Sequence, residues 1–174
     1  MMQSQILPAL GAETALAETV KFAAHQAEIA LDRVGALPWL VTASILASQQ
    51  AAALALRAVG DDIPEQIGAT EMLLRAASAS RLPAPFTLPL TASDRRDFDV
   101  LVEARNATMH PRGRVWHVTA RTLGRGLPVV CRAIRHLVLV QPPVPDLVGA
   151  GQAKEIENAL GAIDALADFL GGQT

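Results

Sequence analysis

Residues 40–59, LVTASILASQQAAALALRAV, decide the fold class of this chain. Alanine and leucine dominate the stretch, and Arg57 near its end is its only charged residue, so the pattern predicts a helix that is apolar nearly all the way round. Such a helix is typical of the centre of a bundle. Gly60 follows and predicts where the helix closes, because glycine readily adopts the left-handed conformation that ends many helices.

The uncharged run 34–56 is long enough to raise the question of a membrane span. Pro38, three hydroxyl side chains and the pair Gln49-Gln50 interrupt it, and these polar groups are costly in lipid. We therefore expect a buried bundle helix and no membrane partner.

Helices are also predicted on both sides of the central one. In residues 13–34 apolar side chains recur three or four apart, which indicates an amphipathic helix that ends near Gly35 and Pro38. The same periodicity predicts a last helix over residues 150–170. Both helices can bury one face against the centre.

A short helix and an extended connector are predicted next. Asp62-Ile-Pro-Glu65 combines a capping aspartate, an early proline and a glutamate, so it predicts a helix from about Asp62 to about Ser78. Residues 81–90 contain three prolines, which exclude a helix and indicate an extended connector. Four apolar side chains are expected to press it onto the bundle: Leu82, Phe86, Leu88 and Leu90.

Two more helices are predicted after the connector. Thr91-Ala-Ser-Asp94 is a second capping pattern, and the helix that it starts carries a polar hexapeptide at its far end. A turn at 111–113 follows, residues 115–123 are ambiguous between strand and helix, and Gly124 to Gly126 predict a break. A fifth helix over residues 129–138 precedes a stiff proline-rich linker.

These elements predict an all-α fold, a bundle of about five or six helices in a single domain, 1–174. Cys131 is the only cysteine, which excludes an internal disulfide, and the first residues do not resemble a signal peptide, so we expect a cytoplasmic location. The sequence offers no cluster of metal ligands, and it predicts neither a metal nor a cofactor.

Charge is segregated along the chain. Residues 104–145 hold seven arginines and no acid, whereas the remainder holds all seventeen acidic residues and eight basic ones. This segment therefore favours an anionic partner. The six aromatic residues include no tyrosine, so a stacking platform for many bases is not expected.

The hexapeptide Arg105-Asn-Ala-Thr-Met-His110 opens the basic segment. On the predicted helix, Arg105 stands on the apolar stripe of Phe98, Leu101, Val102 and Met109, where a leucine is expected. A guanidinium there needs an anion or hydrogen bonds, in a cleft or a subunit interface. The alternative is an internal ion pair with an acid such as Glu103 or Glu71.

His110 precedes Pro111, which biases its backbone out of the helical region, so we expect the helix to end there and the imidazole to swing toward Arg105. Asn106 would fix that turn or orient the imidazole. The alternative interpretation of His110 is a cap or a surface residue.

The alanine-rich helix at 47–57, a further helix, a connector and then Leu101-Val-Glu-Ala-Arg-Asn-Ala-Thr-Met-His-Pro111 resemble the HEPN superfamily (higher eukaryotes and prokaryotes nucleotide-binding). Its signature is an arginine, a polar residue, three variable residues and a histidine at the end of a long helix. The resemblance covers residues 13–140 in helical order, and the hexapeptide is its specific part.

The resemblance implies a homodimer in which the motifs of two subunits face each other, and a metal-independent endoribonuclease of the toxin or defence type. Arg105 would stabilise charge in the transition state, His110 would move protons at the attacking 2′-hydroxyl or the leaving 5′-oxygen, and Asn106 would keep both in register. Such a toxin would have an antitoxin protein as a partner. The alternatives are a non-catalytic module that binds a nucleotide, RNA or a protein, and a helical scaffold in which the hexapeptide is a coincidence.

The remaining arginines of the basic segment are candidates for an RNA-binding surface beside the hexapeptide. We expect single-stranded or looped RNA, because its bases are accessible. The alternatives are a solvated face or an electrostatic partner for the acidic remainder of the fold. The candidates nearest the motif are Arg112, Arg114, Arg121 and Arg125, with Arg132 and Arg135 further along.

Overall fold

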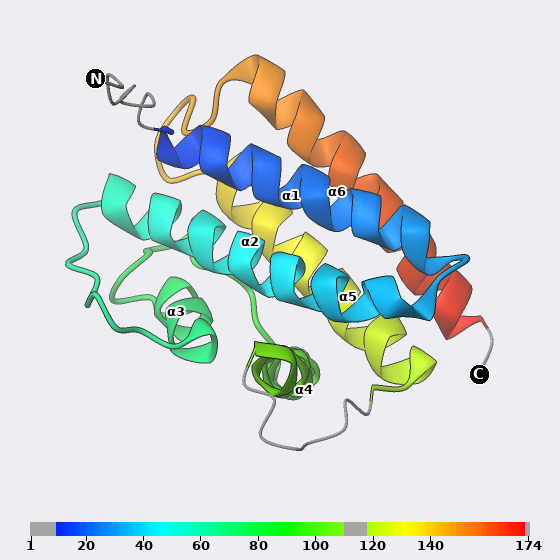
Figure 1. Ribbon diagram of the computed structural model, residues 1–174. Coiled ribbons are helices and arrows are strands. Elements are labelled where there is room, and N and C mark those ends of the chain that lie inside the picture. Colours follow the sequence, from blue (N-terminus) through cyan, green and yellow to red (C-terminus); the bar gives the residue numbers. More distant parts are fainter. Residues whose placement is uncertain (1–9, 110–117, 173–174) are drawn as a thin grey trace, which may run out of the picture.

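The computed structural model describes residues 10–109 and 118–172, and within these ranges the chain is helical, with no strand (Figure 1). The all-α prediction is confirmed. The elements are α1 (Ala12–Ala30), the 3-10 turn η1 (Val34–Ala36), α2 (Leu37–Ala58), α3 (Ala69–Ala76), α4 (Ala92–Met109), α5 (Ala120–Arg135), the π-helical turn η2 (His136–Val140) and α6 (Ala150–Gly171).

The helices form three layers, with α2 and α5 in the middle one. In Figure 1, α1 and α6 lie side by side on one side of this layer, and α3 and α4 lie on the other. The central helix α2 contacts α1, α3, α4, α5 and η2. The buried apolar side chains form one continuous cluster that includes residues of all six α-helices.

Helix α2 is the apolar centre that its composition predicts. Twelve of its residues are buried, and Gly60 closes it with a φ of 79°. Among the described residues, Val34–Ala58 is also the only stretch long and apolar enough to cross a membrane by length and composition, but 61% of its most apolar window is buried inside the bundle. This burial agrees with the role of a core helix.

Local signals place α4 correctly. The Thr91 backbone N–H donates to Asp94 Oδ2 at 3.0 Å, and the Asp94 N–H donates to Thr91 Oγ1 at 3.1 Å, so the predicted capping box is formed. The connector before it is packed as predicted, because Leu82 and Leu88 are buried and Phe86 and Leu90 pack against the core. The ring Nε2 of His136 on η2 lies 3.0 Å from the carbonyl oxygen of Phe86 and ties the connector to the bundle.

The predicted break at Gly124 to Gly126 is wrong, because α5 runs through both glycines. A Cβ atom at Gly126 would lie 2.7 Å from the Leu101 side chain, and one at Gly124 would lie 3.0 Å from the backbone of Gly171. The glycines therefore allow close approach of α5 to α4 and α6. Thr119 caps α5 by accepting a hydrogen bond from the Thr122 N–H at 3.1 Å, so the described part of 115–123 enters a helix and not a strand.

Two other helix boundaries differ from prediction. The first helix ends at Ala30, and Pro38 belongs to the first turn of α2, where proline is tolerated. The third helix begins only at Ala69, and the predicted cap Asp62 lies in the segment before it, where its carbonyl oxygen and the Asp61 carboxylate accept hydrogen bonds from Arg75. The last helix, by contrast, closely matches its predicted bounds.

Candidate functional site at the end of α4

The guanidinium of Arg105 is half-buried between α4 and α2. Its Nη2 donates to Oε1 of Gln49 at 3.5 Å, which is a long hydrogen bond to a neutral acceptor. No carboxylate of residues 10–109 or 118–172 pairs with it, and neither Glu71 nor Glu103 does so. Its positive charge therefore has no internal anion within the described part of the chain.

Two other arginines of intermediate burial are described, and both are neutralised. Arg75 bonds the Asp61 carboxylate at 3.0 Å, and Arg135 bonds Glu157 at 2.9 Å and Asp164 at 2.6 Å. Burial lowers the pKa of Arg135, but the hydrogen bonds and charges of Asp164 and Glu157 outweigh burial and raise the pKa above its usual value. This contrast singles out Arg105, because a partly desolvated cation is normally paired.

The register of α4 explains the partial burial of Arg105. Phe98, Leu101 and Ala104 are the buried residues of this helix, so Ala104 and not Arg105 occupies the core position. Arg105 is at the margin of the core, where its stem can pack while the guanidinium reaches α2. Sequence reasoning did not include Gln49 in this site. The signal that could have indicated it is the pair of amides at 49–50 inside an otherwise apolar helix.

Asn106 is exposed on α4, next to Arg105. His110, Arg112 and Arg114 lie outside the described residues. The convergence of Arg105 and His110 therefore stays a prediction.

The described arginines of α5 divide into two kinds. Arg121 is exposed. Arg125 pairs with Asp97 of α4 at 2.9 Å, and Arg132 pairs with Asp94. Together with Arg135, Arg125 and Arg132 bond α5 to its neighbouring helices. These three arginines thus act as electrostatic partners of the acidic remainder of the fold, one of the alternatives from the sequence.

Asp94 shows how these contacts act on a carboxylate. Burial raises its pKa, but the hydrogen bonds from Thr91 and the Arg132 guanidinium outweigh burial and lower the pKa below its usual value. The Asp94 side chain thus serves the helix cap and the α4–α5 contact at once.

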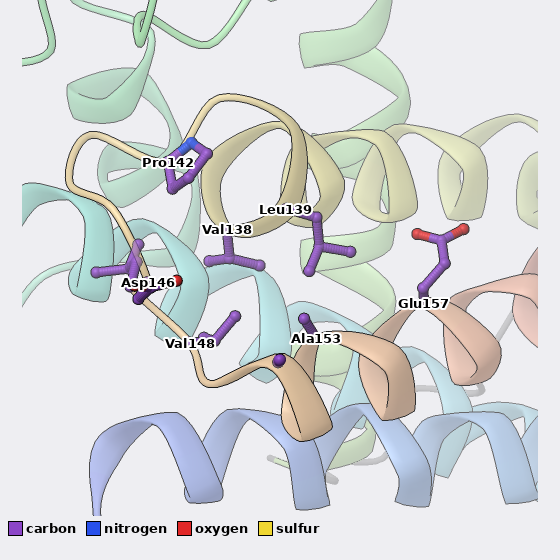
Figure 2. A pocket seen from close by; sticks show the side chains of 9 residues that line it. Val138, Leu139, Pro142, Asp146, Val148, Ala153 and Glu157 are labelled. Carbon is purple, nitrogen blue, oxygen red and sulfur yellow. The ribbon is translucent and has the colours of Figure 1, made fainter.

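A pocket of about 370 Å³ lies between η2, the following linker and the first turns of α6 (Figure 2). Val138, Leu139, Val148 and Ala153 give it an apolar lining. In Figure 2 the Glu157 carboxylate points away from the two valines, in accord with its bond to Arg135. No residue of the hexapeptide lines this pocket, so it is separate from the candidate site.

Other polar groups offer little further chemistry. Cys131 is buried against α6, and burial raises the pKa of its thiol well above the usual value. Within residues 10–109 and 118–172, no group of three histidine, cysteine, aspartate or glutamate side chains is placed to hold a metal ion.

Comparison with known proteins found no matching family model, no matching curated protein and no matching solved structure.

Proposed function

We propose that this protein is a metal-independent endoribonuclease of the HEPN toxin or defence type, active as a homodimer in the cytoplasm. The observation that carries the proposal is the half-buried Arg105 guanidinium, which has an amide contact and no carboxylate partner among the described residues. A cation held in this state is available to a phosphate. The motif sequence and the segregation of positive charge into residues 104–145 support the same assignment.

In the proposed reaction, the 2′-hydroxyl of a nucleotide attacks the adjacent phosphorus while the bond to the 5′-oxygen breaks. One proton leaves the 2′-hydroxyl and one reaches the 5′-oxygen, which yields a 2′,3′-cyclic phosphate and a 5′-hydroxyl. His110 carries protons in these transfers, and Arg105 stabilises the extra negative charge on the phosphorus oxygens. Asn106 orients the two groups.

The proposal is tested by RNA cleavage in the presence of a chelator. We expect Arg105→Ala to lower the rate by about 10²–10³-fold, and His110→Ala by about 10²–10⁴-fold. Arg96→Ala is the matched control, because Arg96 is an exposed arginine of the same helix. Intact RNA with folded wild-type protein contradicts the enzyme assignment. Equal loss in all three variants contradicts the specific roles of Arg105 and His110.

A second candidate is a non-catalytic HEPN-like module that binds a nucleotide, RNA or a partner protein. The observation that favours it is the pairing of Arg125, Arg132 and Arg135 with acids of their own chain, which leaves less positive surface for a long RNA. This candidate predicts salt-sensitive nucleotide binding without turnover. RNA that stays intact at saturating protein supports this binding module and contradicts the nuclease.

A further inference from the structure

An apolar groove lies directly beside the end of α4, between α1 and α2, with a volume of about 570 Å³. Large apolar side chains that are exposed to solvent line it, although burial of such side chains is strongly favoured. A cluster of this kind marks a binding surface. These side chains are Leu10, Phe22, Trp39, Leu46 and Met109.

The groove also contains a hydrogen-bonding group. Gln50 lines it, and the Oε1 atom of Gln50 is buried without a hydrogen-bond partner among the described residues. Such an atom costs free energy unless a donor reaches it. In its present position this oxygen is enclosed by protein, so the amide must turn toward the groove before a ligand N–H group can reach it. The turn breaks no hydrogen bond of Oε1, and the new bond satisfies it, whereas an apolar side chain from another protein leaves it unsatisfied.

The groove and the Arg105 guanidinium are neighbours. Gln50 follows Gln49, the acceptor of the Arg105 hydrogen bond, and Met109 stands one turn beyond Arg105 on α4. Four residues advance an α-helix by about 6 Å, which is comparable with the separation of base and phosphate within one nucleotide. Glu18 is the only charged residue among those that line the groove, so a phosphate belongs at Arg105 and not inside the groove.

We propose that the groove binds the base of an RNA nucleotide whose phosphate lies at Arg105, an inference that rests on the proposed function. Phe22 and Trp39 contact the faces of the base, and the Gln50 amide turns toward the groove and accepts a hydrogen bond from an exocyclic amine, which adenine, cytosine and guanine carry. The chain has too few aromatic residues for a long stacking platform. Two of its three exposed aromatic residues in the described ranges nevertheless share this groove, which suits one base.

The test measures nucleotide binding and needs no cleavage step. The chain has two tryptophans, so in a Trp116→Phe background the emission of Trp39 reports on the groove alone. We expect adenosine 3′-monophosphate and cytidine 3′-monophosphate to quench this emission to saturation, and ribose 5-phosphate, which lacks a base, to leave it unchanged. Equal responses to all three compounds, or no response to either nucleotide, overturn the proposal.

Two variants test the named contacts. Phe22→Ala should weaken nucleotide binding by roughly five- to 100-fold, because a base contact with an aromatic ring is lost. Phe169→Ala is the matched control and should bind as wild type, because Phe169 is 52% exposed and Phe22 is 48% exposed, but Phe169 lies outside this groove. We expect wild type to bind adenosine 3′-monophosphate about three- to tenfold more tightly than purine riboside 3′-monophosphate, which lacks the amine. Gln50→Leu should abolish this preference. Circular dichroism confirms that each variant is folded.

Other outcomes separate this proposal from its alternatives. If Phe22→Ala dissociates a wild-type dimer in sedimentation while nucleotides quench Trp39 as before, the groove is a self-association surface and the proposal is overturned. Base-dependent quenching by a protein that leaves RNA intact supports the groove assignment and contradicts the nuclease. RNA cleavage without base-dependent quenching contradicts the groove assignment alone.

Discussion

The Asp61 side chain is shielded from solvent by its neighbours and is 5% exposed. Arg75 Nη2 lies 3.0 Å from one of its oxygens, and Arg81 Nη1 lies 2.5 Å from the other. Burial raises the pKa of Asp61, but the hydrogen bonds and charges of the two arginines outweigh burial and lower the pKa below its usual value. The ionised carboxylate therefore stabilises the folded state.

This linkage predicts a pH-dependent effect of Asp61→Asn. Because the folded pKa is below the unfolded value of about 3.9, the contribution is present above that value and is lost as the pH falls through the folded pKa. We expect the variant to melt roughly 2–8 °C below wild type at neutral pH, with a smaller difference below about pH 4. Thermal melts across this range measure it. Asp62→Asn is the control, because Asp62 is exposed and gives Arg75 only its backbone carbonyl oxygen.

Arg105 shows how far a residue can be understood from sequence. Apolar spacing on its helix correctly indicates a position near the core, since the residue is half-buried. Its contact with Gln49 could not be predicted, because the two residues are 56 positions apart and the packing of α4 on α2 brings them together. The amide pair at 49–50 is visible in the sequence only as an interruption of an apolar run.

At the scale of elements, the sequence predicts features that depend on neighbouring residues better than features that depend on packing between distant helices. The start of α4 depends on Thr91 and Asp94, which are three residues apart, and the sequence predicts it correctly. The course of α5 through Gly124 and Gly126 depends on partners from α4 and α6 that a local pattern does not contain. Glycine is therefore ambiguous in sequence, because it marks both breaks and close helix contacts.

Two glycine substitutions test this explanation. Gly126→Ala should lower the free energy of unfolding by about 1–3 kcal/mol, because the added Cβ would lie 2.7 Å from Leu101 and 3.1 Å from the Asp97 carbonyl oxygen. Gly161→Ala on α6 meets nothing within 4 Å and should raise it by about 0.5–1 kcal/mol. Urea denaturation measures both changes. Equal stabilisation by the two substitutions would show that α5 has room at Gly126.

At the scale of the whole molecule, part of the basic segment is used inside the fold. Three of its described arginines, Arg125, Arg132 and Arg135, bond acids of α4 and α6, so they hold the layers together. Arg105 and the exposed Arg121 have no carboxylate partner among the described residues. The sequence reveals the segregation of charge, but which arginines are neutralised depends on the packing of helices.

This division predicts different effects on RNA binding. Each phosphate contact to a single strand contributes about −0.7 to the slope of log affinity against log salt concentration. If Arg121 contacts RNA, Arg121→Ala should reduce the magnitude of that slope by about 0.7. Arg125→Ala should leave the slope unchanged, because Arg125 is paired with Asp97, and should lower the melting temperature instead. Filter binding across a salt series, with wild type alongside, distinguishes the two residues.

The placement of Gln49 on the central helix also bears on synthesis of the protein. A ribosome makes α2 before α4, so Gln49 can contact Arg105 only after 56 more residues have been added to the chain. An unfinished chain that stops in the connector lacks the Arg105–Gln49 contact, whatever the state of its first three helices. Translation order thus delays this contact until more than half of the polypeptide exists. For the proposed nuclease, the delay would keep the incomplete chain inactive toward the RNA of its own cell.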